Sequence, residues 1–302
     1  MIFKTFEALT THAKESVKAR RVVVAAAQDP HTLEAVMKVR AEGIVEPILV
    51  GDRVKIEEIL CALKVKVPAE NIYDAPDFAA CAALSVQLVR EGKAQFIMKG
   101  KLETSDILRA VVNKQTGLST GHTMSHIAIN EIPTYHKLLI TTDGGMLLAP
   151  TLEQKKDIIV NAVSALRGLG YECPKVGVLA AAEKVNPKLV DSTDAAALKE
   201  MNLNGEITDC IVEGPISFDL AMVKDRAAAK GYESPCAGDC DILIVPNITA
   251  GNILGKSLVE MAGAKMAGLV MGAKCPIVVT SRGSSSEEKY NALCLAAAMT
   301  RA

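Results

Sequence analysis

The chain has 302 residues, of which 49% are hydrophobic and 23% charged, so it is long enough for two ordinarily packed domains. Its 34 basic residues are balanced by 35 acidic ones, and aromatic residues make up only 3%, which argues against a nucleic-acid-binding protein. No run of about 18 uninterrupted apolar residues, the length a membrane-spanning helix needs, is present. Lys4 and Glu7 interrupt the apolar region that a secretion signal requires, so we expect a cytoplasmic protein that begins with an amphipathic helix.

Apolar runs alternate with helical patterns along the chain, which is typical of βαβ units and a mostly parallel sheet. The first expected strand, residues 22–27, is followed by Asp29 as a helix N-cap and by Pro30 at the first helical position. The later strands are expected at 44–50, 95–98, 127–129, 137–142, 176–181, 209–214, 241–246 and 276–281, and the clearest helices at 75–92, 152–169 and 192–202. This rhythm predicts a doubly wound sheet whose ligands bind at the carboxyl ends of the strands.

Two pairs of residues have spacings that bear on metal binding. Cys236 and Cys240 are the closest pair among the eight cysteines, but no histidine lies near them, and a zinc site needs four ligands. His122 and His126 are four residues apart, yet they lead straight into an expected strand, which favours packed or loop histidines over a helical metal pair. We therefore expect no metal site.

The strongest local pattern lies at residues 275–290. An apolar strand ends in Ser281 and Arg282, and then Gly283 and three serines lead into a helix. Hydroxyl groups, backbone N–H groups and a helix N-terminus all favour an anion, and the guanidinium of Arg282 matches the oxygens of a phosphate. The pattern therefore indicates an anion-binding site.

The same stretch also fits a helix start that binds no ligand. Ser285 and Glu288 have the spacing of a capping box, and so do Ser284 and Glu287. A capping box only satisfies the first backbone N–H groups of a helix. Spacing alone leaves both interpretations open.

A second pattern lies at residues 238–257, where a strand delivers a glycine-containing loop to the start of another helix. Ala250-x-x-x-x-Gly255-Lys256-Ser257 comes close to a nucleotide-binding P-loop, but alanine stands where the stricter pattern begins with glycine. No strand ending in aspartate follows as a P-loop nucleotidase would need. A phosphate-facing loop and a simple strand-to-helix turn both remain open.

Lys99 and Lys101 flank Gly100 directly after the expected strand at 95–98. They place two cations at the carboxyl end of a strand, where a doubly wound sheet binds its ligands. A phosphate-facing pair and a solvated turn both fit this pattern.

Taken together, these residues resemble the phosphate acetyltransferase and phosphate butyryltransferase family. The resemblance runs in order from about residue 20 to the end of the chain, and its pieces are FIMKG (96–100), LLITTDGG (138–145), NAVSALRGLGYECPKVGVLAAAEKVNP (161–187), DAAALKEM (194–201), VEGPISFDLA (212–221), GDCDILIVPNITAGNILGKSL (238–258) and PIVVTSRGSSSEEKYNAL (276–293). It implies an isocitrate/isopropylmalate dehydrogenase-like fold of two doubly wound, three-layer α/β domains that flank a cleft. The expected domains are residues 1–126 with 274–302, and residues 127–273.

The resemblance further implies that the chain exchanges an acyl group between coenzyme A and inorganic phosphate. The short length and the TDGG, EKVNP and TSR segments look more like the butyryl branch, with phosphate acetyltransferase as the alternative. A catalytically weak protein of the same fold that binds coenzyme A or phosphate is a further alternative. Coenzyme A would be a substrate, no cofactor would be needed, and a homodimer or higher homo-oligomer is expected.

For the site residues, the resemblance implies that Ser281 and Arg282 contact the substrate phosphate and carbonyl group. Glu288 stands at the position of the general base, where the acetyl branch has aspartate, and Gly283-Ser284 replaces the Ala-Asp common in the butyryl branch. The expected catalytic residues are therefore Ser281, Arg282 and Glu288. The expected substrate-binding residues are Lys99, Asn247, Gly251, Asn252, Lys256, Gly283 and Ser284.

Overall fold

A computed structural model describes residues 2–16, 18–280 and 283–300. The chain divides into two compact units. The terminal unit comprises Glu7–His122 with Ala267–Ala302, and the central unit comprises Met1–Phe6 with Thr123–Met266. The expected domain borders stay a prediction, because compactness of contacts does not by itself define independently folding domains.

The terminal unit is built on strands in the order β3-β2-β1-β4-β11-β10. All neighbours in this order are parallel except β10 and β11, which run antiparallel. The strands are β1 (Arg20–Ala25), β2 (Val45–Gly51), β3 (Ile72–Asp74), β4 (Phe96–Lys99), β10 (Lys265–Met271) and β11 (Ile277–Val278). Because β1, β4 and β11 are parallel, their carboxyl ends lie at the same edge of the sheet.

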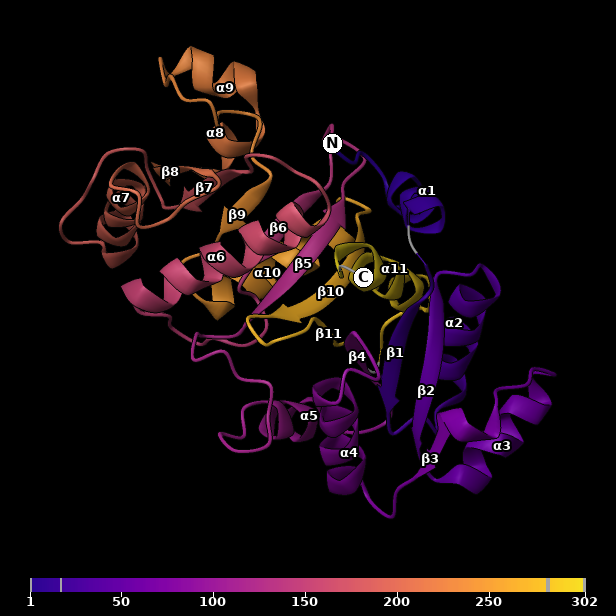
Figure 1. Ribbon diagram of the computed structural model, residues 1–302. Coiled ribbons are helices and arrows are strands. Elements are labelled where there is room, and N and C mark those ends of the chain that lie inside the picture. The colour runs from indigo at the N-terminus through magenta and orange to yellow at the C-terminus, as the bar shows by residue number, and fades with distance from the viewer. Residues whose placement is uncertain (1, 17, 281–282, 301–302) are drawn as a thin grey trace. The chain divides into compact units, whose positions relative to one another are not determined.

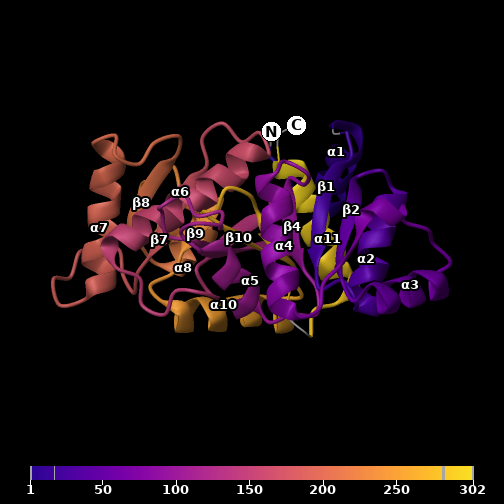
Figure 2. The same cartoon turned by 60° about the horizontal axis from the view of Figure 1, so that its bottom comes forward.

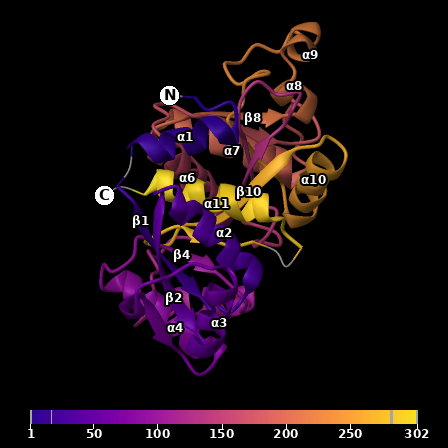
Figure 3. The ribbon, with the colours of Figure 1, turned by 90° about the vertical axis from the view of Figure 1, so that its right-hand side faces the viewer.

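Helices cover both faces of this sheet, which makes three layers. Helices α2 and α11 pack together over one face, and α4 and α5 pack together over the other, as Figures 2 and 3 show. The helices are α1 (Phe6–Ser16), α2 (Pro30–Ala41), α3 (Arg53–Ala62), the short 3₁₀ turn η1 (Ala69–Asn71), α4 (Phe78–Arg90), α5 (Thr104–Val111) and α11 (Ser286–Met299). Every described residue of α11 from Asn291 to Met299 is buried, so this helix is part of the core.

The central unit has strands in the order β5-β6-β9-β7-β8 (Figure 1). β5 runs antiparallel to β6, and the other neighbours are parallel. Helices α6 and α7 pack together on this sheet, and α10 packs against β6. The elements are β5 (Ser125–Glu131), β6 (Leu139–Thr142), β7 (Lys175–Leu179), β8 (Ile211–Ile216), β9 (Ile242–Ile244), α6 (Leu152–Gly168), α7 (Val190–Leu203), α8 (Phe218–Met222), α9 (Lys224–Ala229) and α10 (Ile248–Glu260).

The predicted α/β class is confirmed, and each expected strand is present within a few residues of its expected place. Asp29 caps α2 as predicted: its side chain accepts a hydrogen bond from the backbone N–H of Thr32, and Pro30 is the first helical residue. Strands β3 and β10 are not among the expected ones; near β10, only the neighbouring run at 276–281 is interpreted as a strand. That run forms only the two-residue strand β11 within the described residues.

Two further observations concern the described part of the chain as a whole. Each helix in residues 2–16, 18–280 and 283–300 is too short or too polar to cross a bilayer. Across the same ranges, no three His, Cys, Asp or Glu side chains gather as they would around a metal ion. Cys236 and Cys240 are buried in the apolar core of the central unit, where the Cys240 thiol contacts the Cys236 carbonyl oxygen at 3.2 Å.

Candidate functional site

A pocket of about 370 Å³ lies at the carboxyl ends of β1, β4 and β11 in the terminal unit. This is the edge at which a doubly wound sheet presents its ligand-binding loops. The pocket is therefore the candidate functional site. Its lining residues come from the loops after these strands and from the first turns of α2, α4 and α11: Asp29, His31, Thr32, Phe78, Lys99, Gly100, Lys101, Glu103, Thr280 and Lys289.

The backbone after β4 explains why glycine separates the two lysines at 99 and 101. The N–H of Gly100 donates to the carbonyl oxygen of Ala25 at 2.8 Å, and the N–H of Lys101 donates to that of Ala26 at 2.9 Å. A Cβ atom at Gly100 would lie 2.3 Å from the oxygen of Ala26, a distance that no side chain tolerates. The close approach places Lys99, which is 7% exposed, in the pocket wall as the sequence predicted for a strand end.

The carboxylate of Asp29 serves the start of α2. Its Oδ2 accepts hydrogen bonds from the backbone N–H of Thr32 at 2.9 Å and from the Thr32 hydroxyl at 2.5 Å. Both donors bond the same carboxylate oxygen, so Asp29 caps α2 and at the same time forms part of the pocket wall.

The start of α11 combines a helix cap with a second carboxylate. Ser285 is the N-cap, and its hydroxyl accepts from the backbone N–H of Glu288 at 3.1 Å. The hydroxyl of Ser284 donates to Oε1 of Glu288 at 2.7 Å, and Nζ of Lys289 donates to the carbonyl oxygen of Ser284 at 2.8 Å. The capping interpretation is thus correct for the spacing of Ser285 and Glu288. The Glu288 carboxylate, however, bonds the side chain of Ser284.

The environment of Glu288 raises its pKa above the ordinary value for glutamate. Burial is the main cause, because it disfavours the charged form, while the Ser284 hydrogen bond and the charge of Lys289 offset part of the effect. A carboxylate with a raised pKa is a better proton acceptor than an ordinary one. Glu288 is therefore a candidate for the general base.

Ser281 and Arg282 lie outside the described residues, so their predicted roles rest on sequence alone. In the chain they stand between Thr280, which lines the pocket, and Gly283 and Ser284, which lead into α11. Gly283 is exposed and Ser284 is partly buried.

The other predicted residues lie in the central unit, at the first turns of α10. Asn247 caps the helix, with Oδ1 accepting from the backbone N–H of Ala250 at 3.0 Å. A Cβ atom at Gly251 would lie 2.7 Å from Cα of Gly144, so this glycine allows α10 to contact the loop after β6. Asn252 donates from Nδ2 to the oxygen of Gly144 at 3.5 Å.

These contacts give Asn247, Gly251 and Asn252 roles within the central unit, and Lys256 is exposed on the same helix. Their predicted contact with substrate stays a prediction. Residues 245–247 form a strand-to-helix turn between β9 and α10, which is the simpler of the two interpretations of this pattern.

Sequence reasoning missed several residues of the pocket. His31 and Thr32 could have been found, because they follow the first strand at its carboxyl end, where the strand-end rule applies. Lys289 gave no such signal, since in the run Ser286-Glu-Glu-Lys it reads as an ordinary exposed residue of a helix. Only the packing of α11 buries it to 7% exposure.

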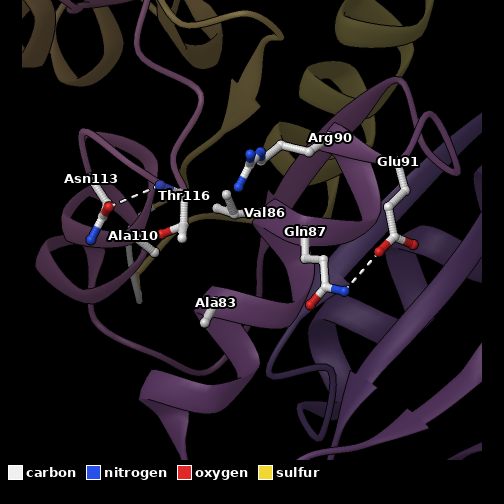
Figure 4. A pocket seen from close by; sticks show the side chains of 8 residues that line it. All are labelled: Ala83, Val86, Gln87, Arg90, Glu91, Ala110, Asn113 and Thr116. Carbon is white, nitrogen blue, oxygen red and sulfur yellow. Dashed lines mark hydrogen bonds between the residues drawn. The ribbon is translucent and has the colours of Figure 1, made fainter.

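A larger hollow of about 590 Å³ lies between α4 and α5 (Figure 4). The sticks in Figure 4 show Arg90 extending over Val86 toward Thr116. Gln87 donates to Glu91 at 2.7 Å, so this pair is engaged locally. Most of the lining side chains are exposed and stand on the outer surfaces of two helices, away from the strand ends. The smaller pocket is the better candidate, because parallel-strand ends and buried charges converge there.

Comparisons with known proteins cover nearly the whole chain. The family model described as "Phosphate acetyl/butaryl transferase" matches residues 5–82 and 77–297. The chain is 42% identical to a phosphate acetyltransferase of Thermotoga maritima, covering 93% of this chain and 95% of that protein. It is 39% identical to a phosphate butyryltransferase of Clostridium acetobutylicum, covering 98% of each.

Solved structures agree with these relatives. A branched-chain phosphotransacylase from Enterococcus faecalis superposes with a TM-score of 0.80 at 33% identity, covering 93% of this chain and 98% of the other. A 4-hydroxythreonine-4-phosphate dehydrogenase from Burkholderia phymatum superposes with a TM-score of 0.57 at 15% identity, covering 94% of this chain and 99% of the other. The second likeness concerns the fold alone, and with the first it confirms the predicted isocitrate/isopropylmalate dehydrogenase-like fold.

Proposed function

Because the chain belongs to the phosphate acetyltransferase and phosphate butyryltransferase family, we propose that it exchanges a short-chain acyl group between coenzyme A and inorganic phosphate. The observation that carries the proposal is the match to acyltransferases over nearly the full length of the chain. The pocket adds chemical support, since the buried Lys99 and Lys289 line it at one end of a parallel sheet, and Glu288, the residue before Lys289 in α11, has a raised pKa.

The proposed reaction is a direct transfer. In the direction of thioester formation, the thiol of coenzyme A gives its proton to a base, and sulfur attacks the carbonyl carbon of the acyl phosphate. The new C–S bond forms, the C–O bond to phosphate breaks, and phosphate leaves with the electron pair of that bond. In reverse, phosphate attacks the thioester and the thiolate recovers the proton.

Glu288 is the proposed base. An ordinary thiol has a pKa of ~8.5. A carboxyl group with a raised pKa lies closer to this value, so proton transfer from the thiol to the carboxylate is less unfavourable. Ser284 holds the carboxylate in place through its hydrogen bond. Glu288 is proposed in preference to Asp29 because the Oδ2 atom of Asp29 is engaged at the start of α2.

Ser281 and Arg282 are proposed to contact the phosphate and the carbonyl oxygen, as the family resemblance implies. A guanidinium donates two parallel hydrogen bonds to a phosphate, and a hydroxyl stabilises charge that develops on a carbonyl oxygen. Lys99, Gly283 and Ser284 are proposed as neighbours of the same substrate. Asn247, Gly251, Asn252 and Lys256 are proposed to face phosphate groups from the central unit.

The acyl group is proposed to have four carbons, with acetyl as the alternative. The chain covers 98% of the Clostridium acetobutylicum butyryltransferase, whereas it covers 81% of the phosphate acetyltransferase of Rickettsia prowazekii. Acetyl remains the alternative, because the chain also covers 95% of the Thermotoga maritima phosphate acetyltransferase. Initial rates with acetyl-, propionyl-, butyryl- and isobutyryl-coenzyme A, each with phosphate, decide between them by the ratio of kcat/KM.

Phosphate-dependent release of coenzyme A thiol tests the whole proposal. Release with at least one acyl-coenzyme A, dependent on phosphate and lost in Arg282→Ala, is the expected result. Folded protein that binds coenzyme A but releases no thiol with any substrate would instead support a binding protein of this fold. Binding of ATP or GTP, which the near-match at Ala250–Ser257 raises, is expected to be absent.

The protein is further proposed to be a cytoplasmic homodimer or higher homo-oligomer that needs no cofactor. The resemblance to the family supports the assembly, and the direct transfer described above needs only the two substrates. Light scattering coupled to size-exclusion chromatography measures the mass of the assembly. Activity that survives exhaustive dialysis against a chelator is the expected result for transfer without a metal.

A further inference from the structure

Lys289 is a charged side chain buried in the pocket, and the nearby Glu288 carboxylate balances part of its charge. The residue is 7% exposed, and its Nζ donates to the carbonyl oxygen of Ser284 at 2.8 Å. An ammonium group has three donors, and burying it without a counter-charge is costly. In the part of the chain that the structure describes, no carboxylate lies within ion-pair distance of this ammonium group. Glu288 acts on Lys289 from beyond ion-pair distance, so the charge is only partly balanced within the described residues, which favours an anion from outside the chain.

The remaining charges of the pocket strengthen this preference. Lys99 is equally buried at the end of β4, and Lys101 adds a third, exposed ammonium. Of the two acids in the wall, Asp29 is held by Thr32 at the start of α2, and Glu103 is exposed. The buried groups that face the pocket are thus mainly cationic.

The pocket is small, which limits the anion that it can hold. Its volume of about 370 Å³ is near the lower end for small-molecule sites, which run from about 300 to 1,000 Å³. A phosphoryl group with a short acyl chain is small enough for such a volume. Lys289 and Glu288 both hydrogen-bond Ser284, so an anion on Lys289 would lie near the proposed base.

We propose that Lys289 binds the phosphate that is exchanged with coenzyme A, by donating from its ammonium group to a phosphate oxygen while the Ser284 carbonyl oxygen holds the side chain in position. The inference deepens the proposed function and rests on it. It adds a substrate-binding residue that the sequence pattern did not identify.

Steady-state kinetics of Lys289→Met test the inference. Methionine has a similar length but no charge, so it removes the donor while filling the space. Loss of one hydrogen bond between charged groups is expected to raise the KM for phosphate by about tenfold or more. The KM for acyl-coenzyme A should change less than twofold, and Lys289→Arg, which keeps the charge, should retain most of the affinity for phosphate.

Two controls separate binding from folding. Lys66→Met removes an exposed lysine from the same unit, outside the pocket, and should leave both KM values unchanged. Inorganic phosphate should raise the midpoint of thermal unfolding of the wild type by ligand binding, and it should do so much less for Lys289→Met. This second measurement needs no turnover.

The outcomes are distinguishable. An active wild type whose phosphate KM is unchanged in a folded Lys289→Met protein overturns the inference while the proposed function stands. A rise confined to the KM for acyl-coenzyme A also overturns it, because the ammonium would then bind a phosphate of coenzyme A. Absence of turnover in the wild type removes the proposed function. If phosphate then still raises the unfolding midpoint of the wild type but not of Lys289→Met, Lys289 binds phosphate all the same.

Discussion

The hydroxyl of Ser284 donates a hydrogen bond to Oε1 of Glu288 at 2.7 Å, and this contact couples the loop before α11 to the carboxylate of the proposed base. The bond favours the ionised carboxylate, whereas burial of Glu288 favours the protonated form. Burial is the larger of the two effects, so the pKa of Glu288 stays above the ordinary value. The reactivity of the carboxylate therefore depends on a serine four residues before it.

Ser284→Ala should move the acid limb of the pH profile to higher pH. Removing the hydrogen bond takes away an interaction that lowers the pKa of Glu288, so the pKa rises further. The base must be ionised to accept a proton, and the limb of kcat/KM that requires ionised Glu288 must follow the pKa upward. Profiles in the direction of thioester formation measure the shift.

Ser286→Ala is the matched control for this shift, because Ser286 is exposed at the first position of α11. Its profile should overlay that of the wild type. A profile that stays in place in Ser284→Ala would mean that Glu288 does not control the acid limb.

Glu288→Gln should lower kcat by at least about 100-fold, since general base catalysis contributes on the order of 10²–10⁴. Glutamine keeps the size of the side chain and can still accept from Ser284, so both KM values should change little. Stopped assays of thioester formation at saturating substrates measure the loss. A decrease below tenfold would assign the proton transfer to another group.

Two glycines on α10 should respond to alanine in opposite directions. At Gly251 a Cβ atom would lie 2.7 Å from Cα of Gly144 and 2.9 Å from the oxygen of Asp143, so Gly251→Ala must displace backbone. We expect it to lower the free energy of unfolding by about 1–3 kcal/mol, as overpacking does. At Gly255 no atom lies within 4 Å of the added carbon, and Gly255→Ala should raise stability by up to about 1 kcal/mol through helix propensity.

Urea unfolding of the two variants measures this difference on one helix. Equal effects in both would show that the contact between Gly251 and Gly144 is not what requires glycine. An unchanged unfolding midpoint in Gly251→Ala would also leave that glycine available for a role toward substrate.

Asp239 should make the stability of the central unit depend on acid pH. Burial by itself raises its pKa, but hydrogen bonds from Lys137, Lys175 and His136 together lower it well below the ordinary range. A carboxyl group whose pKa is lowered by folding contributes stability above its unfolded pKa, near ~3.9, and loses it as the pH falls further. Asp239→Asn should therefore destabilise the protein clearly at pH 7 and by a smaller amount near pH 3, where the loss of this stabilisation has begun but is not complete.

Urea titrations at the two pH values measure that difference. The control is Asp225→Asn in α9, whose carboxylate is exposed, and it should have a small effect at both pH values. A destabilisation of Asp239→Asn that is equal at pH 7 and pH 3 would contradict the ion-pair explanation.

The sequence alone determined the α/β class, most strand positions and the Asp29 cap, and it limited the N-cap of α11 to Ser284 or Ser285. These features are local: apolar runs set strands, and a capping side chain bonds backbone groups only a few residues away. The family resemblance likewise followed from the order of short segments along the chain. It indicated Glu288 and Lys99 without any coordinates.

The tertiary structure alone decided which of these residues share a pocket and which of them are buried. Lys289 looks exposed in the sequence, but α11 packs into the core and buries it beside the ends of β4 and β11. Gly251 looked like a ligand-facing glycine, yet its missing side chain is explained by Gly144, more than a hundred residues earlier. Burial and contact between distant segments are long-range properties. Neither can be read from spacing, because spacing describes only neighbours along the chain.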